Sequence, residues 1–131
     1  MRPNAATADA ARVDAAVAAR DPNALRELFA EDLQVDDHTT GIVFDRQGAL
    51  SSFGYLITAR NPTCRHEPLA TLGETLSIYR FSVSASGLGR GKLDVGAYEK
   101  EEIHLNGVDA DGRRRWGEVF ATEHLAEAIA R

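Results

Sequence analysis

The sequence predicts an α+β fold, with helices gathered in the first half of the chain and antiparallel strands in the second. Apolar residues recur at helical spacing over residues 7–20 and 45–59, and they alternate at strand spacing over most of residues 63–121. Turn signals separate the alternating segments. Helices that precede a series of hairpins favour α+β over a parallel α/β sheet. The chain has 131 residues, which is the length of one domain, so residues 1–131 are expected to form a single domain. Only residues 1–5 are expected to be flexible.

Each predicted helix begins at a recognisable signal. Residues 7–20 are rich in alanine and predict the first helix. Asp21, followed by proline, starts a short second helix, because aspartate caps free N–H groups and proline suits the first helical position. Asp45 caps a long third helix, which runs to about residue 59 and ends before Pro62.

The predicted strands alternate with turns. A short strand over residues 32–39 follows the second helix, and its alternation sends Asp36 and Asp37 to opposite faces. The later strands are expected at residues 63–72, 75–85, 93–108 and 113–121, joined by hairpins. Thr122 is expected to cap a final helix.

Composition and charge exclude several classes of function. The net charge is −5. The one basic run, Arg113–Arg115, lacks interleaved aromatic residues, which argues against nucleic-acid binding, and it is expected to be a solvated strand start. Cys64 is the only cysteine, so no internal disulfide forms and a reducing, cytoplasmic location is the default expectation. No apolar run is long enough for a signal peptide or a membrane span. The histidines show no metal-ligand spacing, so no metal is expected: His38, His66, His104 and His124.

Several segments resemble the nuclear transport factor 2-like superfamily, and the likeness covers nearly the whole chain. Leu28–Asp32 runs into Val35–Asp37, and Asp109–Arg113 runs into Glu118–Phe120. The resemblance implies a cone, in which a strongly curved antiparallel sheet wraps around the long third helix and leaves a cavity open at the wide end.

Within that superfamily the sequence looks like the SnoaL-like branch. His66–Gly73 and Asp94–Glu99 are similar to small domains appended to large actinobacterial regulatory proteins. Members use the cavity either as a cofactor-free acid–base site, as in ketosteroid isomerases, polyketide cyclases and some epoxide hydrolases, or as a binding and dimerisation surface. Fold alone does not decide between an enzyme and a non-catalytic module. In either case the resemblance implies a small hydrophobic organic ligand.

Asp37 is the predicted general base. It lies on the strand face of Leu33 and Val35, and in an ungapped alignment it falls on the general base of the ketosteroid isomerases. A carboxylate in an apolar pocket is expected to have a raised pKa, which suits proton transfer near neutral pH. The alternative is an aspartate that accepts backbone N–H bonds in the turn at residues 39–41.

His104 is the second predicted catalytic residue. The same alignment places it where the isomerases have a protonated aspartate, and imidazole donates a hydrogen bond or carries a proton near neutral pH. Glu102 and Asn106 share its strand face. The alternative is a histidine on a solvated or dimer face. The oxyanion-binding tyrosine of the isomerases falls at Val13, so a steroid isomerase proper is not expected.

Other side chains are predicted for the cavity wall and for the outer sheet face. The residues expected to contact the ligand are Phe53, Tyr55, Tyr98, Val119 and His38. Aromatic residues at such spacing also occur in ordinary cores. Trp116 and Phe120 are expected on the outer face, where they predict a homodimer interface. Ala121 stands where many cyclase-like relatives have an acid, which weakens the cyclase interpretation.

Overall fold

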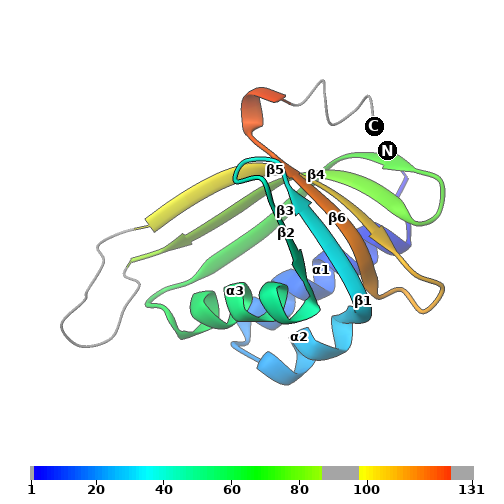
Figure 1. Cartoon of the computed structure of the whole chain (residues 1–131). Coiled ribbons are helices and arrows are strands. Elements are labelled where there is room, and N and C mark those ends of the chain that lie inside the picture. Colours follow the sequence, from blue (N-terminus) through cyan, green and yellow to red (C-terminus); the bar gives the residue numbers. More distant parts are fainter. Residues whose placement is uncertain (1, 87–97, 125–131) are drawn as a thin grey trace.

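A computed structural model describes residues 2–86 and 98–124 of the chain (Figure 1). The helices are α1 (Ala5–Ala18), α2 (Pro22–Leu28) and α3 (Arg46–Thr58). The strands are β1 (Phe29–Asp37), β2 (Ile42–Asp45), β3 (Thr63–Leu72), β4 (Leu76–Ala85), β5 (Tyr98–Val108) and β6 (Arg114–Phe120), followed by the 3-10 turn η1 (Thr122–His124). The three helices lie on the concave side of one curved sheet, which confirms the predicted α+β cone.

Capping side chains explain where the helices begin. The Asn4 side chain accepts from the backbone N–H of Thr7 at 3.0 Å, and the Thr7 hydroxyl accepts from the backbone N–H of Asn4. The Asn4 amide also donates to the carbonyl of Leu76, so Asn4 is held in place although the sequence predicts a flexible segment up to residue 5. Asp21 and Asp45 accept backbone N–H bonds at the starts of α2 and α3, as predicted.

The sheet has the strand order β2-β1-β6-β5-β4-β3 and is mixed. The pair β1–β6 is parallel, and every other pair is antiparallel. The expectation of a purely antiparallel sheet is therefore wrong at this one pair. The physical reason is that β1 and β6 are joined through α3 and the whole meander, a connection long enough to bring the chain back in the same direction.

One strand of the structure is not predicted from the sequence. The sequence predicts the turn at residues 40–41 but no strand after it, whereas β2 forms an edge strand against β1 there, with the exposed side chains of Ile42 and Val43. The start of the strand predicted over residues 93–108 and most of the predicted final helix lie outside the described residues. Within the described part of the chain, no helix is long and apolar enough to cross a membrane.

The two faces of the sheet carry separate apolar clusters. The larger cluster lies between the concave face and the helices and includes Val13, Val17, Leu33, Phe81 and Val119. The smaller cluster lies on the opposite face and consists of Ile78, Ile103, Leu105 and Phe120, with Leu69 packed against it. On that outer face Trp116 is 37% exposed, whereas Phe120 is only 1% exposed and is part of the core rather than the surface.

Candidate active-site cavity

A cavity of about 340 Å³ lies between α3 and the concave face of the sheet. Apolar side chains form most of its wall, among them Leu33, Val35, Phe53, Leu56, Phe81 and Val83. Polar and charged side chains line the rest: Asp37, Lys100, Glu102, His104, Asn106 and Arg114. An apolar hollow with a few polar groups is the usual form of a small-molecule site.

Strand register places Asp37 and His104 on either side of Val119. Asp37 lies opposite Val119 in the parallel pair β1–β6, and Val119 lies opposite His104 in the pair β5–β6. Since neighbouring strands are about 4.8 Å apart, the Cα atoms of Asp37 and His104 are separated by about 10 Å. We call this set the Val119 row. All three of its side chains line the cavity, so a small molecule over Val119 has a carboxylate on one side and an imidazole on the other.

The Asp37 carboxylate accepts hydrogen bonds from a turn and also lines the cavity. Its Oδ1 accepts from the Thr39 backbone N–H at 2.9 Å and from the Thr39 hydroxyl at 2.6 Å. These are the turn contacts that the alternative interpretation predicts. The side chain nevertheless lines the cavity, while Asp36 points to the opposite face and lies 3.8 Å from His38. The turn contacts thus fix the direction of a carboxylate that faces the cavity.

His104 is held by Glu102 and Phe81. Its Nε2 lies 3.2 Å from Glu102 Oε1, and its ring stacks on Phe81 at 4.1 Å between centroids. Burial lowers the pKa of His104, so the imidazole is neutral near pH 7. Burial also acts to raise the pKa of Glu102, but His104 and Lys100 together hold it below its usual value. An ionised Glu102 only accepts, so the single ring N–H of His104 is directed to it and Nδ1 is left as an acceptor.

The predicted wall residues divide into two groups. Phe53 and Tyr55 on α3, Tyr98 on β5 and Val119 on β6 line the cavity. Tyr55 is 77% exposed and therefore lies where the cavity meets solvent. His38 is not among the lining residues, and its predicted contact with the ligand is not supported.

His38 lies instead on the outer face of the sheet. Its Nε2 is 2.9 Å from Glu118 Oε1, and its ring stacks on Phe120 at 4.6 Å between centroids. The reason is alternation: Asp37 points into the cavity, and the chain turns directly after it. Asp36 completes this outer cluster.

Arg114 is a buried cavity residue that sequence reasoning missed. Its Nε donates to Asp9 Oδ2 at 3.2 Å, its Nη2 donates to His66 Nε2 at 3.2 Å, and its guanidinium lies over the Phe29 ring. Burial raises the pKa of Asp9, and the charge of Arg114 opposes that change. The basic run that includes Arg114 predicts a solvated strand start, which is wrong for this member. A usable signal was the spacing of Asp9 four residues before Val13, which places it on the buried stripe of α1.

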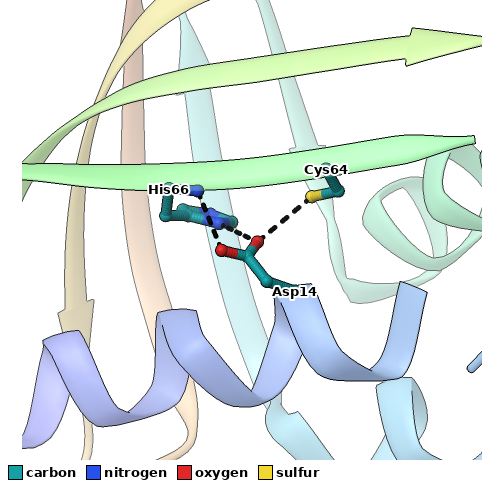
Figure 2. Close-up of side chains that lie close together, drawn as sticks. All are labelled: Asp14, Cys64 and His66. Carbon is teal, nitrogen blue, oxygen red and sulfur yellow. Dashed lines mark hydrogen bonds and ion pairs between the residues drawn. The ribbon is translucent and has the colours of Figure 1, made fainter. Parts of the chain in front are cut away.

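Asp14, Cys64 and His66 form a second group between α1 and β3, in which His66 is buried and the other two are half-buried (Figure 2). Asp14 Oδ1 lies 2.6 Å from His66 Nδ1 and 3.3 Å from Cys64 Sγ, and Oδ2 accepts from the backbone N–H of His66 at 2.9 Å. Burial lowers the pKa of His66 to about 4 and raises the pKa of the Cys64 thiol. His66 is thus a buried residue, 7% exposed, rather than a surface one.

The proton positions in this group follow from Arg114. A guanidinium only donates, so His66 Nε2 accepts and the ring proton is on Nδ1, where it is directed to Asp14. A metal ion on Nδ1 would need that proton on Nε2, facing the Arg114 N–H. The donor atoms lie within 4.8 Å of one another, but this arrangement favours hydrogen bonding over metal coordination.

No protein-family model matches the chain, and no curated protein matches it. Solved structures match over nearly its full length. IdmH from Streptomyces antibioticus has a TM-score of 0.69 at 18% identity, covering 95% of this chain and 96% of that one. The fold is that of the nuclear transport factor 2-like proteins.

Two further structures with this nuclear transport factor 2-like fold show its range. SalBIII, an epoxide hydrolase/cyclase-like enzyme with a role in pyran ring formation in the polyether salinomycin, matches with a TM-score of 0.69 at 17% identity and covers 87% of this chain and 88% of that one. A Mycobacterium tuberculosis protein in complex with estradiol-17beta-hemisuccinate matches with a TM-score of 0.67 at 14% identity, with coverages of 89% and 93%. At these identities the likeness concerns the fold.

Proposed function

We propose that the protein is a cofactor-free acid–base enzyme that acts on a small, mostly apolar organic molecule carrying a carbonyl group. The observation that carries this proposal is the Val119 row, in which Asp37 and His104 face one cavity from either side of Val119. Chains with this fold include a cyclase-like enzyme and a protein that holds a steroid derivative, which supports the same class of ligand.

In this proposal Asp37 removes a proton from a carbon next to the carbonyl, and the electron pair of the broken C–H bond moves to the carbonyl oxygen. The proton then returns from Asp37 to another atom of the same molecule, so no co-reactant is consumed. Such a base contributes about 10²–10⁴-fold to the rate. The Thr39 contacts hold the carboxylate in one direction during both transfers.

His104 is the second proton-handling group. Because its N–H is directed to Glu102, its Nδ1 lone pair takes a proton from a hydroxyl group of a ligand that carries one. The imidazolium that results is stabilised by the Glu102 charge and returns the proton to the same molecule, so that His104 ends the reaction neutral. Glu102 is a positioning residue, since it fixes the ring and its tautomer. In this assignment His104 first accepts a proton from the ligand and then donates it, whereas the sequence alignment alone suggests a permanent hydrogen-bond donor.

Hydrogen exchange at carbon tests the proposal without knowledge of the natural substrate. The rate at which β-tetralone exchanges its α-protons in D₂O is followed by NMR with the wild type, Asp37→Asn and Asp36→Asn. Asp37→Asn should lower the enzyme-dependent rate by about 10²-fold or more. Asp36→Asn is the matched control, because it makes the same change one residue away on the outer face. Equal rates in the wild type and Asp37→Asn would remove Asp37 from the mechanism.

A non-catalytic ligand-binding or dimerisation module is the second candidate. Val13, at the position of the isomerase oxyanion tyrosine, is fully buried in the core and offers no hydroxyl to the cavity. In this case β-tetralone binds but its α-protons exchange at the rate found in buffer.

A homodimer through the outer sheet face is part of the same proposal. The half-exposed Trp116 supplies the aromatic contact there, while Phe120 is buried and supports it only from within. Light scattering at micromolar concentration that returned a monomer would exclude this assembly. The reducing cytoplasm is the proposed compartment, which fits a single cysteine.

A further inference from the structure

Arg114 has hydrogen-bond donors that its protein partners leave free. Its side chain is only 6% exposed, and it lines the cavity. Nε donates to Asp9 and Nη2 donates to His66, whereas Nη1 meets no acceptor among the described residues. A buried donor without a partner is costly, and a charged donor is more costly than a neutral one. The arrangement therefore favours an acceptor that enters from the cavity and binds at Nη1.

Accessible surface distinguishes Nη1 from other unpaired polar atoms of the interior. Among the described residues, three buried side-chain atoms have neither a partner nor appreciable accessible surface, so no ligand reaches them: Asp9 Oδ1, Tyr79 OH and Asn106 Nδ2. Nη1 of Arg114 is not one of these atoms, so it is unpaired and retains accessible surface. Its two neighbouring nitrogens are bonded, and the guanidinium lies over the Phe29 ring, which also lines the cavity. The accessible part of the guanidinium therefore faces the cavity.

The guanidinium is held beside the buried stripe of α1 and close to His104. Asp9, which binds Nε, lies one helical turn before Val13, the position of the isomerase tyrosine. His66, which binds Nη2, has its ring 6.3 Å from the ring of His104. Burial lowers the pKa of His104, and the charge of Arg114 adds to this effect, so that charge acts within the same cavity. Arg114 thus offers a charged donor on the α1 side, where Val13 offers none.

The surrounding charges show which kind of acceptor fits. Asp9 Oδ2 lies 3.2 Å from Arg114 Nε, and Asp14 Oδ1 lies 2.6 Å from His66 Nδ1, on the far side of the imidazole. A ligand carboxylate at Nη1 would be repelled by these two carboxylates, and the low dielectric of the interior strengthens the repulsion. An uncharged oxygen meets no such repulsion and still accepts a charge-assisted hydrogen bond. The site therefore favours a carbonyl oxygen over a carboxylate.

We infer that Arg114 binds the carbonyl oxygen of the ligand through Nη1–H···O. The inference rests on the proposed function for the presence of a carbonyl ligand in this cavity. It makes Arg114 a catalytic residue, because the guanidinium then donates to the oxygen that becomes negative when Asp37 removes the proton. Loss of one such donor typically lowers a rate by about 10²–10³-fold. The ligand is thereby an uncharged, mostly apolar molecule whose carbonyl group is directed to the α1 side of the cavity.

A pair of probes isolates this hydrogen bond. β-Tetralone and tetralin share one bicyclic skeleton, and only the ketone has an acceptor oxygen. Their dissociation constants are measured by ligand-observed NMR titration with the wild type and with the double variant Asp9→Leu, Arg114→Met, which removes both charges of the buried pair. Loss of a charged donor should weaken β-tetralone binding by about tenfold or more, while tetralin binding stays within about twofold. A wild type that does not prefer the ketone would overturn the inference.

Asp9→Asn is the matched control, because it breaks the same ion pair and leaves the guanidinium in the protein. It should lower stability and keep the preference for the ketone within about twofold of the wild-type value. A loss of preference as large as in the double variant would mean that the effect follows the ion pair and not a contact with the ligand, which overturns the inference. If the double variant does not fold, Arg114→Gln takes its place, because its amide donates to Asp9 without a charge, and the same loss is expected.

Failure of this inference can be told apart from failure of the proposed function. A preference for the ketone that depends on Arg114, in a wild type that exchanges no α-protons, keeps the binding role and rejects the proposed catalysis. A preference that does not depend on Arg114, in a protein that exchanges α-protons through Asp37, does the reverse. Where both proposals hold, the double variant should also exchange about 10²-fold more slowly at saturating β-tetralone. An unchanged rate at saturation would reject the catalytic role of Arg114.

Discussion

Two histidine–carboxylate pairs lie on the concave side of the sheet, and their surroundings differ. His66 has partners on both ring nitrogens, and both oxygens of its partner Asp14 accept hydrogen bonds. His104 is bonded to Glu102 through one nitrogen and has the cavity beside it. The His66–Asp14 pair therefore connects β3 to α1, whereas the His104–Glu102 pair lines the cavity. Saturation of hydrogen bonds, rather than residue type, distinguishes a structural pair from a candidate functional pair.

The largest expected effect comes from breaking the buried ion pair that anchors the structural region. Asp9→Ala leaves the Arg114 guanidinium buried without its carboxylate, and it should lower the free energy of unfolding by about 3–5 kcal/mol. Chemical denaturation measures this loss. The double variant Asp9→Leu with Arg114→Met removes both charges and should recover part of it. A single variant as stable as the wild type would mean that the pair does not hold α1 to the sheet.

The second largest effect is expected from acid, which should destabilise the region around the His66–Asp14 pair. The pKa of His66 is lowered from 6.5 to about 4 on folding, so between these values the unfolded chain binds the extra proton. The contribution of His66 to the free energy of unfolding is therefore fully present above pH 6.5. It decreases by roughly 3 kcal/mol as the pH falls to 4. Denaturation curves at pH 7 and pH 4 test this. His66→Gln, compared at the same pH values, isolates the contribution of His66 from that of Asp9 and other acids, and an unchanged pH dependence in this variant would refute it.

One substitution made in both regions sharpens the contrast. Asp14→Asn places an amide NH₂ where the carboxylate receives three hydrogen bonds, and it should cost about 2 kcal/mol of stability. Asp37→Asn keeps an oxygen for Thr39 and should change stability by less than about 0.5 kcal/mol. Thermal melts of the two variants provide the comparison. Similar losses in both would show that Asp37, too, is mainly structural.

Among the histidine variants, the smallest effect is expected on the outer face. His38→Ala removes a partly exposed contact with Glu118 and the ring stacked on Phe120, and it should cost less than about 1 kcal/mol. Measured by the same denaturation method as His66→Gln, it provides a histidine control from outside the saturated network. A cost equal to that of His66→Gln would contradict the distinction between the two networks.

Local signals in the sequence predicted most of the fold. Helix caps at Asp21 and Asp45 and the hairpin turns are encoded within a few residues, so the helices and the meander follow from short-range chemistry. The register of the Val119 row is not local. It depends on β1 pairing with β6, across about eighty residues, and alternation alone shows only that one of Asp36 and Asp37 faces inward.

Buried charges were the least predictable part of the site. Charged residues are usually exposed unless they are paired, and the partner of Arg114 lies 105 residues earlier in the chain. Without that contact the basic run predicts a solvated surface. Asn106 illustrates the same limit, because its unpaired donor becomes visible only when the surrounding chain is in place.

The parallel pairing of β1 with β6 also bears on the order of folding. A large loop must close before Asp37 meets Val119, and contacts of such long range are costly in chain entropy and form slowly. The β4–β5 hairpin and the helix caps need no such closure. Substitutions that weaken the parallel pair β1–β6 should therefore increase the unfolding rate and change the folding rate little. The cavity should be among the last parts of the protein to form.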